Sequence, residues 1–182
     1  MKILNSKFYI LNSKAFTMIE LLVVMGTITL LSSVLIMYSR AGERQIVLFK
    51  EQAKVVTLLI KARSLSIGTF GDSGAPCDYG VHFSPPDTAI LFREYSPSND
   101  SQCSDVNKIY DSPGEKIEEI KLNSVVRFGV LELTDVVFIP PDPQVIIDSD
   151  PNKPSALIKI QTIDGSAEKT VKITNAGQIT TQ

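Results

Sequence analysis

The sequence has no tryptophan, a single histidine and only two cysteines among its 182 residues. One histidine leaves little material for acid–base chemistry. It is His82, which lies between Val81 and Phe83 in an alternating stretch, and no serine or cysteine motif accompanies it as a nucleophile. A Walker-type glycine loop is also missing from the sequence, so nothing indicates that this chain hydrolyses a nucleotide. We therefore predict that the protein is not an enzyme and has no catalytic residues.

Metal-binding patterns are equally scarce. His82 and the two cysteines would supply three zinc ligands if they met, but the Cys-x-x-Cys spacing of structural zinc sites is missing. Four polar residues could imitate a calcium loop: Asp142, Asp148, Asp150 and Asn152. Their spacing matches no calcium-ligand pattern, and the prolines among them are typical of an ordinary exposed loop. We expect no metal and no cofactor.

An excess of positive charge is lacking as well. The chain holds 18 basic and 20 acidic residues, for a formal net charge of −2. Sequence-independent binding of nucleic acid depends on cations that neutralise phosphates. The last residues, 174–182, contain no Lys or Arg. We therefore expect no nucleic acid among the partners.

What the chain does contain is a long apolar run, from Phe16 to Met37, with Glu20 as its one charge. At about 1.5 Å per helical residue the run spans roughly 33 Å, enough to cross a hydrocarbon core of about 30 Å. A carboxylate in such a helix costs about 2.5–3.5 kcal/mol at the bilayer centre and less near the end. Glu20 is therefore predicted to have a partner, unless the run is a plain signal anchor with Glu20 at the headgroups.

The residues around Glu20 carry a specific likeness. Lys14-Ala15 followed by Phe16-Thr17-Met18-Ile19-Glu20-Leu21-Leu22-Val23-Val24 resembles the prepilin leader junction of type IV pilins and type II secretion pseudopilins. The resemblance implies cleavage between Ala15 and Phe16, N-methylation of Phe16, and pairing of Glu20 with the terminal amine of a neighbouring subunit. The chain departs from the family at Ala15, where glycine is usual.

The resemblance also implies how the chain is divided and where it resides. Residues 1–15 would be a removed leader, 16–39 a transmembrane helix, 40–68 its amphipathic continuation and 69–182 a β-rich extracytoplasmic head. The protein would cross the bacterial cytoplasmic (inner) membrane once, with its N-terminus in the cytoplasm and its head in the periplasm or outside, and would enter a filament after processing. Its partners would be other pilin or pseudopilin subunits, the prepilin peptidase, the inner-membrane assembly platform and membrane lipid.

The rest of the chain predicts an α+β fold. Between Glu43 and Leu65 the apolar residues Ile46, Phe49, Ala53, Val56 and Ile60 recur at helical spacing, and Gly68 is a plausible end of the helix. Alternating strands then follow, at Tyr79–Arg93 as a hairpin and at Lys116–Leu122, Val125–Leu133, Val136–Ile139, Val145–Ile147, Ile158–Gln161, Val171–Ile173 and Gln178–Thr180. Such alternation is typical of antiparallel sheets with one face in water. A long helical spine packed on an antiparallel β-rich head is also what the pilin resemblance implies.

Three short segments sharpen the resemblance toward the GspH/FimT-type minor pilins: Lys61–Ile67, Val136–Pro140 and Val171–Ile179. The resulting hypothesis is a minor pilin or pseudopilin, a structural subunit of a type II secretion pseudopilus or type IV pilus. The alternative is a monomeric membrane-anchored binding protein whose head presents the loop Gly71–Pro76 or Pro140–Pro154 to a ligand.

The two cysteines, Cys77 and Cys103, both fall in the predicted exported head. Disulfides form in oxidising compartments, so a bond between them is the leading prediction, with two free thiols as the alternative.

Overall fold

The structure, a computed structural model, describes residues 17–71, 74–96, 103, 106–141 and 144–182, without the side chains of 37–41. The predicted leader and the junction between Ala15 and Phe16 therefore lie outside the described residues, as do parts of both loops proposed for ligand binding. The chain forms two compact units, Met1–Ala41 and Gly42–Gln182.

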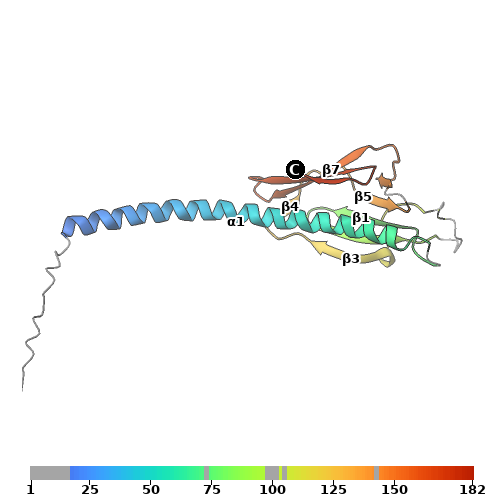
Figure 1. Ribbon diagram of the computed structural model, residues 1–182, viewed down its shortest axis with the longest axis horizontal. Helices are drawn as coiled ribbons and strands as arrows, with labels where there is room; N and C mark the ends of the chain where they lie inside the picture. Colours follow the sequence, from blue (N-terminus) through green and yellow to red (C-terminus); the bar gives the residue numbers. More distant parts are fainter. Residues whose placement is uncertain (1–16, 72–73, 97–102, 104–105, 142–143) are drawn as a thin grey trace, which may run out of the picture. The chain divides into compact units, whose positions relative to one another are not determined.

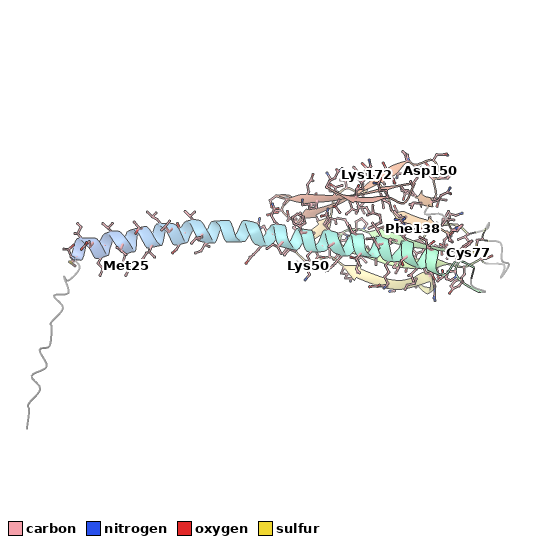
Figure 2. All side chains as sticks on the ribbon, viewed as in Figure 1. Met25, Lys50, Cys77, Phe138, Asp150 and Lys172 are labelled. Carbon is pink, nitrogen blue, oxygen red and sulfur yellow. A yellow bond between two sulfur atoms is a disulfide. The ribbon has the colours of Figure 1, made fainter. Side chains whose placement is uncertain are left out.

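In the first unit, helix α1 begins at Met18, and it is assigned through to Gly68. Its segment Met18–Ile36 has a mean hydropathy of 2.2 and is long and apolar enough to cross a membrane, a test of length and composition that a signal sequence also passes. The side chains point outward all round, Met25 among them (Figure 2). Within it the Thr27 hydroxyl donates to the carbonyl of Val24 at 2.9 Å and the Ser33 hydroxyl to that of Leu30 at 2.8 Å, so these hydroxyls bond back to the preceding turn.

The second unit holds two antiparallel sheets, so the predicted α+β class is confirmed. The five-stranded sheet has the order β3-β2-β1-β5-β6, with β1 (Asp78–Ser84), β2 (Thr88–Glu94), β3 (Lys116–Lys121), β5 (Asp135–Ile139) and β6 (Gln144–Ile147). The four-stranded sheet has the order β4-β7-β8-β9, with β4 (Val126–Phe128), β7 (Ser155–Thr162), β8 (Glu168–Thr174) and β9 (Ile179–Thr181). One 3-10 turn, η2 (Pro113–Glu115), precedes β3.

Most of the predicted strands are present, including the hairpin that became β1 and β2. The exception is the strand predicted from Val125 to Leu133. Only its residues Val126–Phe128 form a strand, which pairs with β7. The helix ends at Gly68, as predicted.

The part of α1 after Gly42 runs alongside both sheets (Figure 1). Its buried face is formed by Leu48, Val55, Leu58, Leu59 and Ala62, which join one core with residues of both sheets, such as Phe138 of β5 and Ile158 of β7 (Figure 2). This face closes the apolar side of each sheet away from water, which is the main source of stability in such a layered domain.

Polar side chains on the same helix face link it to each sheet. The Gln52 amide donates to the carbonyl of Thr170 on β8 at 2.9 Å, and the Ser66 hydroxyl donates to the carbonyl of Phe138 on β5 at 2.9 Å. Glu51, only 1% exposed, accepts from the Lys54 ammonium at 2.8 Å and from the backbone N–H of Asn123 at 3.2 Å. These bonds satisfy groups that would otherwise be costly to bury.

The apolar stripe identified from the sequence is not the buried face. Of its members only Val56 is partly buried against the core, while Ile46, Phe49, Ala53 and Ile60 are exposed and the charged residue Glu51 is buried. The helix therefore has two apolar stripes. The sheets cover the stripe that contains Leu48, Val55 and Leu59. This stripe also carries Gln52 and Ser66, which bond to backbone carbonyls of the strands.

The outer face of the five-stranded sheet also departs from the prediction of one wet side. Phe92 of β2 and Val137 of β5 are fully buried although they lie outside the main core. Residues 106–115, here called the covering segment, pack against this face at Phe92. Tyr110 of this segment lies with its ring centroid 5.2 Å from that of His82 and 5.7 Å from that of Phe92. The four-stranded sheet does alternate as predicted, since β7 has every second residue buried.

Gly80, in the middle of β1, makes this second layer possible. A Cβ atom there would lie 2.4 Å from Cζ of Phe92 and 2.9 Å from the carbonyl oxygen of Val136. Overpacking of this kind typically costs about 1–3 kcal/mol. We expect Gly80→Ala to lower the free energy of unfolding by that amount in denaturant titrations of the full chain in detergent. Gly114→Ala is the matched control, because its Cβ would find Ser112 Oγ at a comfortable 3.7 Å; equal losses in the two variants would contradict the packing argument.

Candidate functional site

The first candidate site is the start of α1. Glu20 Oε2 accepts from the backbone N–H of Thr17 at 3.1 Å and from its hydroxyl at 3.2 Å, while Thr17 Oγ1 accepts from the N–H of Glu20 at 3.3 Å. This reciprocal pair is a capping box, which satisfies N–H groups that the first turn leaves unpaired. Its sequence signal is the spacing Thr17-x-x-Glu20 ahead of the apolar run.

The capping box engages only one carboxylate oxygen of Glu20. Both residues are exposed, and among the described residues no hydrogen bond reaches Oε1. A carboxylate has room for about four hydrogen bonds over its two oxygens. Glu20 can therefore cap its own helix and still receive a cation from another molecule.

The second candidate site is the uncovered stripe on α1 in the second unit, formed by Ile46, Phe49, Ala53, Ile60 and Ile67. Ile46, Phe49 and Ile60 are each more than half exposed. The Lys169 ammonium lies 4.4 Å from the ring centroid of Phe49 and shields one part of it. Ile46, Ala53, Ile60 and Ile67 recur at every seventh position, the spacing of a seam that packs against another helix.

Two open grooves also lie along this part of α1. One, of about 480 Å³, is lined by Glu43, Arg44, Val47, Asn123, Val125, Thr162, Ile163 and Asp164. The other, of about 400 Å³, is lined by Lys50, Ala53, Lys54, Thr57, Leu58, Lys61, Glu118 and Ile120. Ion pairs cross both of them, Arg44 with Asp164 and Lys61 with Glu118. The first pair joins α1 to the loop after β7, and the second joins it to β3.

The third feature lies at one end of the β1–β2 hairpin. Cys77 and Cys103 form the predicted disulfide, with Cα atoms 5.5 Å apart. The backbone N–H of Cys77 donates to the carbonyl of Glu94 at 2.7 Å. Directly beside this bond Asp78 and Glu94 are cross-strand partners, and they are only 2% and 5% exposed.

Burial raises the pKa of the Asp78 carboxyl to about 6, against the opposing influence of Lys108. Burial likewise raises the pKa of Glu94 to about 7, and the carboxylates of Glu115, Asp111, Asp78 and Asp135 add to that rise. Among the described residues, no hydrogen-bond donor reaches the buried Oε1 of Glu94. Sequence reasoning missed both acids, because polar residues in an alternating strand predict exposure.

Of the other residues considered from the sequence, Asp142 lies outside the described residues, whereas His82 and Asp148 have structural partners. His82 Nδ1 lies 2.9 Å from Oδ1 of Asp135. Asp148 accepts from the backbone N–H groups of Thr134 and Asp135 and from the Lys153 ammonium, which hold its pKa below the ordinary value against the effect of burial. Within the described part of the chain, no three His, Cys, Asp or Glu residues are placed to hold a metal ion.

Comparison with known proteins identifies no relative: no family model, no curated protein and no solved structure matches this chain.

The disulfide is expected to contribute to the stability of the head. It closes a loop with a sequence separation of 26, for which the chain-entropy estimate is about 3–4 kcal/mol. Replacing Cys77 and Cys103 together by alanine should lower the free energy of unfolding by about that amount, measured with the full chain in detergent. Reductant should destabilise the native chain and leave the double variant unchanged. Equal sensitivity of the two proteins to reductant would contradict a role for this bond.

Proposed function

We propose that this protein is a minor pilin or pseudopilin, a structural subunit that enters a type II secretion pseudopilus or a type IV pilus after leader cleavage and N-methylation at Phe16. The observation that carries the proposal is the uncovered apolar stripe on α1, Ile46 to Ile67, beyond the segment apolar enough to cross a membrane.

The stripe calls for a protein partner, because the charged residues beside it would be costly to place in lipid. Met18–Ile36 is apolar all round, so a bilayer would satisfy it. From Gly42 onward the exposed apolar residues alternate with Glu43, Arg44 and Lys50, charges that would be expensive to place in hydrocarbon. A stripe at heptad spacing next to charged flanks is what a helix presents to another helix in water. A filament built around bundled helices supplies that neighbour.

Glu20 supports the same proposal from the other end of the helix. Cleavage before Phe16 would create an α-amino group, which is largely cationic near neutral pH because its ordinary pKa is about 7.7–8.0. Oε1 of Glu20 would accept that amine from an adjacent subunit while Oε2 remains in the capping box. A pair of this kind offsets the cost of burying each charge in a low dielectric.

Processing is the first expectation to check. In the native host, intact-mass and N-terminal sequencing of the membrane-extracted protein should find a chain that begins at methylated Phe16. Ala15→Arg, which replaces the small residue before the cut by a large charged one, should accumulate as the full-length precursor. A native protein that retains Met1 would contradict processing at this junction.

Incorporation into filaments is the second expectation. Ile60→Glu should reduce the amount of the subunit in sheared filaments by at least about tenfold, since it places a charge in an apolar seam. The free energy of unfolding should change by no more than about 0.5 kcal/mol, because Ile60 is exposed. Glu20→Gln should lower incorporation as well, with unchanged processing.

Matched controls distinguish a specific loss of incorporation from a general effect of changing the surface charge. Val130→Glu places the same charge at an apolar residue that is 86% exposed and outside the stripe, and Glu43→Gln removes an exposed acid outside the membrane segment. Both should assemble normally. A photo-activatable group at Leu21 should cross-link to a neighbouring subunit. Normal assembly of both Ile60→Glu and Glu20→Gln, without cross-links, would favour the monomeric membrane-anchored binding protein instead.

A further inference from the structure

The end of the β1–β2 hairpin carries an inference that does not depend on filament formation. Asp78 is the first residue of β1 and Glu94 the last of β2, and the two strands place them opposite each other. They lie on the outer face of the sheet, in the same row as the pairs Gly80–Phe92 and His82–Ile90. Both are buried there, next to the disulfide at Cys77 and near Lys108, Asp111 and Glu115 of the covering segment.

Charges around the pair are predominantly negative. Asp135 of β5, Asp111 of the covering segment and Glu115 of η2 all raise the pKa of Glu94. Lys108 is the cation that acts on Asp78, and the ring of His82 is bonded to Asp135.

The other charged or titratable groups of the neighbouring elements are directed elsewhere. The Arg93 guanidinium, next to Glu94 on β2, lies over the ring of Tyr95 at 5.2 Å. The Lys116 ammonium of β3 bonds to Glu119 at 3.2 Å. Tyr110 packs with its ring against His82 and Phe92.

Burial favours a proton as the neutralising ion of this pair. Asp78 and Glu94 are only 2% and 5% exposed, so a lysine or arginine of another molecule cannot reach them in this conformation. Metal ligation is unfavourable too, because no suitable group of three ligands exists among the described residues. A proton fits, since it neutralises the carboxyl without adding volume.

We propose that Asp78 and Glu94 form a proton-operated latch, which holds the covering segment on the outer face of the sheet when protonated and loosens it when the protons are lost.

The covering segment is the element that gives way, because it is held less tightly than the strands. β1 is bonded on both sides, to β2 and to β5. The segment is attached by isolated contacts, such as the N–H of Tyr110 to Asp135 at 3.2 Å and the Ser149 hydroxyl to the carbonyl of Asn107 at 3.2 Å. Local opening there would admit water to two charged carboxylates at a much lower cost than unpairing the sheet.

The direction of the pH effect follows from proton linkage. A carboxyl whose pKa is raised in the closed state binds its proton more tightly there than in the open state. At a pH below the ordinary pKa of a carboxyl group, protonation of the two acids favours the closed state. This preference is lost as the pH rises through the closed-state pKa, about 6 for Asp78 and about 7 for Glu94.

Hydrogen exchange measured by mass spectrometry tests the latch on the full chain in detergent. After correction for intrinsic exchange rates, the protection of residues 106–115 should fall at least about tenfold between about pH 5.5 and about pH 8. Peptides from β7 and β8 should keep their protection and serve as the internal reference. Equal protection of the covering segment at both pH values would overturn the proposal.

Uncharged substitutions of similar shape test whether the two acids cause the pH dependence of this protection. Glu94→Gln and Asp78→Asn should each keep the segment protected at about pH 8 and reduce its pH dependence severalfold. Glu168→Gln is the matched control, because Glu168 is exposed on β8 and pairs with Lys159, so it should behave like the native chain. If Glu94→Gln does not fold, Asp78→Asn decides. A pH dependence that survives in both variants, or that only His82→Gln removes, would overturn the proposal.

Discussion

The second unit depends on one face of one helix. Between Leu48 and Ser66, α1 provides the apolar surface on which both sheets close, and Gln52 and Ser66 bond it to a strand of each. Without the helix, the apolar inner side of each sheet would face water. The helix is therefore a layer that both sheets share. Because an amide and a hydroxyl need specific carbonyls, these polar contacts also fix the rotation of the helix about its axis.

That rotation decides what the molecule offers to others. Turning Leu48, Val55 and Leu59 inward leaves Ile46, Phe49 and Ile60 outward, at a spacing suited to another helix. The exposed stripe is thus a consequence of the internal packing. In the filament we propose, the same helix would serve two sets of contacts, one with its own sheets and one with neighbouring subunits, while Glu20 provides a charge-based contact near its start.

The outer face of the five-stranded sheet shows a different balance. Phe92 and Val137 gain stability from burial on this face, but burial there also takes Asp78 and Glu94 out of water. Apolar burial and carboxylate solvation thus oppose each other within one layer. Protonation shifts this balance, so the segment that covers the face is the natural place for a response to pH. The disulfide between Cys77 and Cys103 ties the chain at the same end of the hairpin and limits how far it can open.

The sequence by itself determined the α+β class, the membrane-length apolar run, the end of the helix at Gly68 and the pairing of β1 with β2, because each rests on local signals: composition, periodicity and turn residues. Only the tertiary structure decided which stripe of α1 is buried. Two stripes satisfy helical periodicity, and the choice depends on carbonyls in β5 and β8 that are far away in the sequence. The burial of Asp78 and Glu94 was decided the same way. Strand alternation predicts that they face water, whereas the fold buries them and brings Asp111 and Glu115 of a remote segment close enough to act on Glu94, which no local pattern encodes.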